Sequence, residues 1–210
     1  MRRLPIYILL DTSGSMQGEP IEAVKTGLLS LLSSLRKDPY ALETVWVSII
    51  TFDLEAVVRI PLTEVSELTL PEIPVPETSP TNLGSAIELL CDQYRKEIVI
   101  SNAQHKGDWL PLAIIMTDGA PSDTQHYNRM LEQLKNYKFA RIICCAAGPK
   151  AKVEPLKCMT KDVFTLDTMD SGTFSKFWVW VSTAVERQSQ LVDLQPNELP
   201  PPPEEIKLVI

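Results

Sequence analysis

Residues 9–16, LLDTSGSM, end an apolar run abruptly with one carboxylate and three hydroxyl groups. The run itself, residues 4–10, is apolar without alternation, which predicts a strand buried on both faces, as in a parallel sheet. Asp11, Ser13 and Ser15 then occupy alternate positions, and alternate side chains of an extended backbone point the same way. The stretch therefore predicts three oxygen atoms that converge at the carboxyl end of a buried strand.

Outward from this stretch, the chain alternates helical and strand patterns. Residues 43–52 and 56–60 are rich in β-branched side chains, and their short connection predicts an antiparallel hairpin. Apolar spacing of three and four predicts the helices, and short apolar runs predict the remaining strands. We expect helices over residues 19–37, 83–97, 123–138, 154–158 and 173–188, and further strands ending at 117–118 and over 140–147 and 163–166. This order predicts an α/β fold with a doubly wound, mainly parallel central sheet and helices on both faces.

Two further loops of such a fold are expected near the first. Ligand sites form beyond the carboxyl ends of the strands, where the strand order reverses. The loop SPTNLG, residues 79–84, offers Thr81, and the end of the strand AIIMTDG offers Asp118. Gly14, between the two serines, is expected to permit the turn that brings its neighbours together.

These side chains form a set of hard oxygen donors that suits Mg²⁺ or Mn²⁺, whereas zinc prefers sulfur and imidazole. Only two of them are carboxylates, so the charge of a divalent ion would be nearly balanced. Such an ion would retain affinity for one more anionic oxygen, from water or from an Asp or Glu of a partner protein. The same residue types also serve as ordinary helix caps. The candidate ligands are Asp11, Ser13, Ser15, Thr81 and Asp118.

The composition limits the function classes. The chain has 210 residues and a formal net charge of −7, which argues against sequence-independent nucleic-acid binding and adsorption to anionic lipid. No apolar run is long enough to span a bilayer, and the basic start has no cleavage site of a signal peptide. The 4 cysteines show no CxxC spacing, so we expect buried, reduced thiols and a cytoplasmic location.

The segments LLDTSGSMQG, SPTNLGSAI and IIMTDGAPSD resemble the three parts of the metal-ion-dependent adhesion site (MIDAS) of von Willebrand factor A (VWA) domains. The first 28 residues resemble more narrowly the bacterial tellurium-resistance-associated, TerY-like group. This resemblance implies one antiparallel edge strand and a divalent ion held by the five candidate ligands, with Asp118 often acting through water. It also implies a protein-binding module without enzymatic activity, associated with a kinase, a phosphatase and other stress-response proteins. We expect a VWA domain over residues 1–191 and a proline-rich tail over 192–210.

Other function classes find less support. An aspartic protease needs a second Asp-Thr-Ser-Gly loop, a dehalogenase-like phosphatase needs a carboxylate where Ser13 stands, and no phosphate-binding glycine motif occurs. No serine in a strained turn accompanies His105 or His126, which are expected at the surface. A metal-independent scaffold is the other alternative, and an exposed Trp180 on the last helix could serve it. Four polar residues are candidates either to orient the metal ligands or to cap helices and turns, namely Asp53, Ser79, Asn82 and Asp123.

Overall fold

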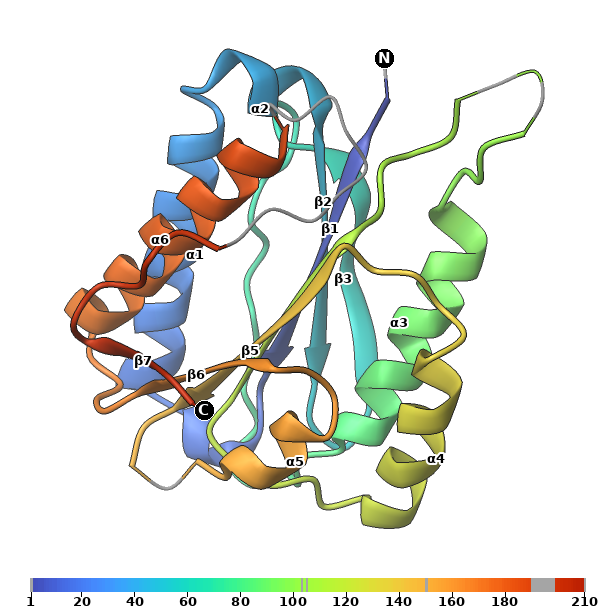
Figure 1. Cartoon of the computed structure of the whole chain (residues 1–210). Coiled ribbons are helices and arrows are strands. Elements are labelled where there is room, and N and C mark those ends of the chain that lie inside the picture. The colour runs from blue at the N-terminus through green and yellow to red at the C-terminus, as the bar shows by residue number, and fades with distance from the viewer. Residues whose placement is uncertain (1, 103, 105, 150, 190–198, 210) are drawn as a thin grey trace.

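A seven-stranded sheet in the order β3-β2-β1-β4-β5-β6-β7 organises the chain (Figure 1). The computed structural model describes residues 2–102, 104, 106–149, 151–189 and 199–209. All neighbouring pairs from β2 to β6 are parallel, whereas β3 and β7 run antiparallel to their neighbours at the two edges. The strands are β1 (Leu4–Asp11), β2 (Val45–Phe52), β3 (Ala56–Glu64), β4 (Leu112–Thr117), β5 (Arg141–Ala147), β6 (Asp162–Leu166) and β7 (Ile206–Leu208).

Helices cover both faces of this sheet. The helices are α1 (Glu19–Leu35), α2 (Pro39–Thr44), α3 (Leu83–Glu97), α4 (Thr124–Leu134), α5 (Val153–Lys157) and α6 (Ser171–Ser189). Helices α1 and α6 lie together on one face, and α3 and α4 on the other (Figure 1). Their close approach needs Gly27 in α1, because a Cβ there would lie 2.2 Å from the Cδ1 atom of Trp178 in α6.

The central strand β1 explains why its sequence is apolar without alternation. Every residue of β1 is buried. Ile6, Ile8 and Leu10 belong to the core under α1 and α6, whereas Tyr7 and Leu9 belong to the core under α3 and α4. Because successive side chains point to opposite faces, a strand between two helical layers must be apolar at every position.

The predicted doubly wound fold and the β2–β3 hairpin are confirmed. Helix α2 was not expected, since Asp38 and Pro39 suggested only the end of the preceding helix. The Asp38 carboxylate accepts a hydrogen bond from the Ala41 N–H at 2.7 Å, so this pair also caps a new helix. Strand β3 continues through Pro61 to Glu64, which an edge strand tolerates because its outer side needs no ladder hydrogen bond.

The second unexpected element is β7, which gives the sheet an antiparallel strand at its other edge as well. It lies within the segment predicted as a proline-rich tail, and the predicted boundary at residues 191 and 192 lies outside the described residues. The expectation of an exposed Trp180 is wrong, because its side chain is buried and its indole N–H donates to the Pro200 carbonyl oxygen at 2.9 Å. The chain segment before β7 therefore covers the face of α6 that the helical pattern left open.

The predicted thiol burial holds for Cys91, Cys144 and Cys145, whereas Cys158 is exposed, and none of the four is in a disulfide. Among the described residues, no helix combines the length and apolar character needed to cross a bilayer. The described histidine, His126, is partly exposed at the surface beside Glu88 and Asp123, and His105 lies outside the described residues.

Candidate metal centre

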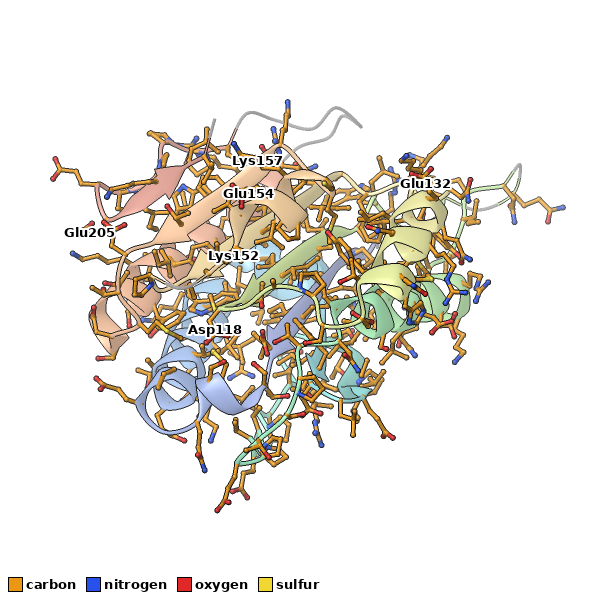
Figure 2. The ribbon with its side chains drawn as sticks, turned by 90° about the horizontal axis from the view of Figure 1, so that it is seen from below. Asp118, Glu132, Lys152, Glu154, Lys157 and Glu205 are labelled. Atoms are coloured by element: carbon orange, nitrogen blue, oxygen red, sulfur yellow. The ribbon has the colours of Figure 1, made fainter. Side chains whose placement is uncertain are left out.

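The carboxyl ends of β1 and β4 form the centre of one edge of the sheet. The chain leaves β1 through α1 on one face, and it reaches β4 from α3 on the other face. Strand β1 is therefore a switch point of the topology, where α/β folds open a crevice for ligands. Figure 2 views this edge from below and shows Asp118, which follows β4, close to the blue segments that follow β1.

Asp11 is the innermost member of the candidate site. It is 1% exposed, and it forms no ion pair within the described part of the chain. Its Oδ1 atom accepts a hydrogen bond from the Ser13 N–H at 2.8 Å, and its Oδ2 atom accepts one from the Thr117 hydroxyl at 2.5 Å. Burial raises the pKa of Asp11 to about 6, although the hydrogen bonds from Thr117 and Ser13 act against this shift. A cation at this carboxylate would remove that cost.

Hydroxyl groups lead from Asp11 toward solvent. The Ser13 and Ser15 Oγ atoms lie 3.2 Å apart, and the Ser15 hydroxyl donates to Asp118 Oδ1 at 2.9 Å. Ser13 is 2% exposed and Asp118 8% exposed, whereas Ser15 is exposed. The cluster is thus closed toward the core and open on one side, as a site for an ion with an outside ligand requires.

The local backbone differs from the expectation of a continuous extended stretch. Ser13 is extended, but Gly14–Met16 form a single 3-10 turn that returns the Ser15 side chain toward Ser13. Gly14 does not have the positive φ that would demand glycine. Instead, a Cβ at this position would lie 2.8 Å from the Glu77 carbonyl oxygen, so glycine is needed for close approach of the next loop.

Thr81 joins the cluster through the loop after β4. It is 7% exposed, and a Cβ at Gly119 would lie 3.1 Å from its Oγ1 atom. Two hydrogen bonds tie the loops together, since the Thr81 N–H donates to Ser122 Oγ at 3.1 Å and the Ser122 N–H donates to the Thr81 carbonyl oxygen at 2.8 Å. The three segments that carry the predicted ligands therefore meet: Asp11, Ser13, Ser15 and Asp118 are linked by direct hydrogen bonds or through Thr117 at the strand end, and Thr81 lies against Gly119.

The four residues considered as orienting groups hold loops together and do not contact the cluster in any hydrogen bond seen among the described residues. Asp53 accepts a hydrogen bond from the Thr12 hydroxyl at 3.0 Å, and the Ser79 hydroxyl accepts one from the Leu54 N–H at 3.0 Å. The Asn82 amide donates to the Leu54 carbonyl oxygen at 2.9 Å.

Asp123 caps α3 from outside that helix. Its carboxylate accepts hydrogen bonds from the N–H groups of Gly84 at 3.1 Å and Ser85 at 3.0 Å. Capping is one of the two roles predicted for Asp123, although it caps the neighbouring helix rather than its own. Thr117 and Ser122 were not foreseen, and the only signal for Thr117 is its place next to Asp118 at the strand end.

The chemistry of the donors fits a hard divalent cation. The candidate ligands offer carboxylate and hydroxyl oxygens only. Within the described residues, no group of three or more His, Cys, Asp or Glu side chains is placed to hold a metal ion. The candidate site instead combines two carboxylates with neutral hydroxyls. This donor set suits Mg²⁺ or Mn²⁺ better than a soft metal.

Comparison with protein families identifies the family to which the chain belongs. The model of the von Willebrand factor type A domain matches residues 6–175, which include all of the candidate ligands. The chain belongs to the VWA family. None of the curated proteins compared with the chain matches it.

Solved structures share the VWA fold at low sequence identity. A von Willebrand factor type A protein from Catenulispora acidiphila is 14% identical, with a TM-score of 0.65 over 88% of this chain and 43% of that one. Proximal thread matrix protein 1 from the mussel byssus is 17% identical, with a TM-score of 0.60 over 86% of this chain and 47% of that one. The chain thus spans less than half the length of each of these two structures.

A further structure of the mussel protein has zinc in its MIDAS motif. It is 16% identical to this VWA chain, with a TM-score of 0.59 over 88% of this chain and 46% of that one. At this identity the likeness shows the fold, and the metal remains an observation about the mussel protein. The zinc-containing structure shows that a protein of similar fold carries a divalent ion at the motif that the present sequence resembles.

Proposed function

We propose that this VWA domain is a metal-dependent protein-binding module. In this proposal Asp11, Ser13, Ser15, Thr81 and Asp118 hold a divalent ion, and an Asp or Glu of a partner protein completes its coordination. The observation that carries the proposal is the hydrogen bond from the Ser15 hydroxyl to Asp118 Oδ1 at 2.9 Å, which joins the loops after β1 and β4 across an edge that opens to solvent.

Magnesium or manganese is the ion that the donor set favours. Both ions accept oxygen ligands and near-octahedral geometry, with Mg²⁺–oxygen distances of about 2.1 Å. Because only two of the five donors are carboxylates and the others are neutral hydroxyls, the ion would keep affinity for a further anionic oxygen, which would bind the ion directly. Zinc occupies the MIDAS motif of the mussel protein, so Zn²⁺ belongs in the same titration as a third candidate.

The partner that we propose offers a carboxylate on an exposed loop or helix end. The resemblance of the first 28 residues to the TerY-like group suggests a setting in the bacterial cytoplasm, in a tellurium-resistance or stress-response complex that includes a kinase or phosphatase. The domain would act there by binding and not by catalysis.

Metal binding is tested by thermal unfolding with and without 5 mM EDTA, MgCl₂, MnCl₂ or ZnCl₂. An ion that binds only the folded chain stabilises it by about 2.7 kcal/mol at a hundred times its dissociation constant. We expect Mg²⁺ or Mn²⁺ to raise the unfolding midpoint of the wild type but not of Asp11→Ala. Asp92→Ala, which removes a carboxylate on α3 outside the cluster, is the matched control and should keep the full metal effect.

Partner binding is tested by pull-down from the native cell in Mg²⁺, with EDTA and with Asp11→Ala. Loss of the same partners under both conditions supports the proposal. Equal retention of partners would contradict it and favour a metal-independent scaffold. A hydrolase activity that is lost in Asp11→Ala would instead favour an enzyme.

A further inference from the structure

The opposite edge of the sheet, where the parallel strands begin, carries a hollow of about 590 Å³. It is formed by the chain before β1, the end of α3, the segment between α3 and β4, and the turn after α4. That segment projects at the upper right of Figure 1, far from the edge that carries the metal centre. Large side chains line the hollow, among them Arg2, Tyr94, Ile98, Trp109, Tyr137 and Lys138.

The hollow has a positive charge that its own acidic residue does not balance. Asp108 also lines it, but its carboxylate pairs with Arg3 at 2.6 Å and accepts the Val99 N–H at 2.8 Å. Arg2 donates to the carbonyl oxygens of Gly107 at 2.8 Å and Asp108 at 3.1 Å, which fixes the guanidinium without neutralising it. Within the described residues, neither Arg2 nor Lys138 forms an ion pair.

Aromatic surface lies beside these cations. The Arg2 guanidinium carbon lies 5.9 Å from the centre of the Trp109 ring, and the rings of Tyr94 and Tyr137 meet edge to face at 5.1 Å. At the rim, Val99 is 50% exposed and Ile100 is 76% exposed. Two adjacent apolar side chains this exposed at the rim of an aromatic hollow are typical of an interaction site.

The exposed apolar pair is held by specific contacts. The Asp108 N–H donates to the Val99 carbonyl oxygen at 2.8 Å, and the Gly107 N–H donates to Ser101 Oγ at 2.8 Å. The backbones approach so closely that a Cβ at Gly107 would lie 2.3 Å from the Val99 carbonyl oxygen. A rim that is fixed before binding loses less conformational entropy when a ligand arrives.

We infer that this hollow is a second protein-binding site, which takes a short acidic peptide segment through one large apolar side chain. The apolar side chain would enter between Trp109 and Tyr137, and flanking carboxylates would face Arg2 and Lys138. The inference does not depend on the metal centre. Together with the proposed metal-dependent site, this second site would let the domain hold two partners at once, as an adaptor does.

The charge pattern favours an acidic peptide over the other large ligands. Two uncompensated cations on a chain of net charge −7 are too few to track a phosphate backbone or an anionic membrane. They suffice to orient a segment with two or three carboxylates, and the aromatic lining supplies the apolar contact that such a segment would also need.

The test uses a synthetic fluorescein-labelled peptide with a central Leu-Phe pair flanked on each side by Glu and Asp. Binding is followed by fluorescence anisotropy and by the indole N–H signal of Trp109 in a ¹H–¹⁵N spectrum, assigned with Trp109→Phe. We expect saturable binding that shifts this signal, and equal affinity with Mg²⁺, with EDTA and in Asp11→Ala. A peptide with Ser-Ser at its centre, and one with Gln and Asn in place of the acids, should each bind at least about tenfold more weakly.

Three surface variants distinguish binding in the hollow from general charge effects. Lys138→Glu, whose ammonium group forms no ion pair within the described chain, should weaken peptide binding about tenfold. Lys37→Glu changes the charge equally at the end of α1, outside the hollow, and should leave the affinity unchanged within twofold. Ile100→Asp should weaken binding without changing the unfolding midpoint, because its side chain is 76% exposed.

Several results would overturn the inference. They are absence of saturable binding, equal binding of the Ser-Ser or amide peptide, and loss of binding in Asp11→Ala but not in Lys138→Glu. The last result would place the peptide at the metal centre. Sedimentation that shows a concentration-dependent dimer, abolished by Ile100→Asp, would assign the hollow to a second copy of this chain. Failure of the metal titration would leave this test unaffected, so the two proposals fail separately.

Discussion

The candidate metal cluster and the C-terminal segment, residues 199–209, both add polar groups to an apolar sheet, but they satisfy those groups differently. In the cluster, the buried Asp11 carboxylate accepts hydrogen bonds from Thr117 and Ser13 and forms no ion pair with any residue that the structure describes. In the C-terminal segment, the Pro200 carbonyl accepts the buried Trp180 N–H, and Ile206 is 2% exposed. Within the described part of the chain, the first arrangement leaves a carboxylate charge without a counterion, whereas the indole N–H of the second has its hydrogen-bond acceptor.

The difference separates a ligand site from a structural contact. Burying a carboxylate without a cation lowers stability, and the raised pKa of Asp11 records this cost. Burying an indole with its hydrogen-bond partner stabilises the fold. We therefore expect substitutions in the C-terminal contact to reduce stability under all conditions. The effect of substitutions in the metal cluster should depend on pH and on the ion.

The largest effect is expected from Trp180→Ala. This change removes a large buried side chain that packs against Phe164, with ring centres 4.6 Å apart, and it should lower the free energy of unfolding by about 3–5 kcal/mol. Trp180→Phe keeps most of the volume but leaves the Pro200 carbonyl without its donor, so the loss should be about 1 kcal/mol. Urea unfolding at pH 7 measures both.

The metal response is the control for this pair of variants. The rise in unfolding midpoint with Mg²⁺ should be the same in Trp180→Phe as in the wild type, since Trp180 is not part of the cluster. If Trp180→Ala cost less than about 1 kcal/mol, the C-terminal segment would not stabilise α6 as its contacts indicate.

The next effect is the pH dependence of the free energy of unfolding of the metal-free chain. The pKa of Asp11 is about 6 in the folded chain, above its ordinary value of 3.8. Between these two pH values the folded chain keeps a proton on Asp11 that the unfolded chain has released. The contribution of this group to the free energy of unfolding should therefore increase by up to about 3 kcal/mol as the pH falls from 7 to 4.

The measurement compares the wild type with Asp11→Asn in EDTA across this range, so that the other carboxyl groups cancel. With Mg²⁺ present, protons compete with the ion, and the metal-induced stabilisation should decline as the pH falls through 6. Parallel curves for the wild type and Asp11→Asn in EDTA would contradict an uncompensated buried charge.

The fold and the position of the metal cluster could be predicted from the sequence. The continuous apolar run of β1 and the helical spacing of α1, α3 and α6 gave the layers and the mainly parallel sheet. Because parallel strands present their carboxyl ends at one edge, the order of the elements also predicted that three distant segments would meet there.

The C-terminal contact could not be predicted in the same way. Strand β7 has three residues, and no local pattern marks Ile206 as a core position. The helical pattern of α6 placed Trp180 away from the main apolar stripe, and only the tertiary contact with Pro200 buries it. At the metal cluster, the role of Gly14 was missed for a similar reason, because the Glu77 carbonyl that excludes a Cβ comes from another loop.

A smaller effect is expected from Thr117→Val, which removes the hydroxyl that donates to Asp11. The pKa of Asp11 should rise further, and the free energy of unfolding at pH 7 without metal should fall by about 1–3 kcal/mol. Thr165→Val is the matched change beside the C-terminal segment, where the hydroxyl donates to the Lys207 carbonyl at 3.5 Å. Its loss should be below about 0.5 kcal/mol, since so long a bond at the surface contributes little. Equal losses in urea unfolding would remove the contrast between the two regions.

The smallest effect is expected from the exposed ion pairs of the C-terminal segment. Lys176 on α6 pairs with Glu205, and Lys207 pairs with Asp167, but these side chains are 43–62% exposed. Surface pairs of this kind contribute little because water and salt screen them and long side chains lose entropy. Lys176→Ala and Lys207→Ala should therefore leave the urea midpoint unchanged at 150 mM salt. If either variant lost as much stability as Trp180→Phe, charge pairing rather than the buried Trp180 and Ile206 would hold the segment. That result would contradict the contrast between a C-terminal segment stabilised by buried contacts and a metal cluster that contains a buried charge without a counterion.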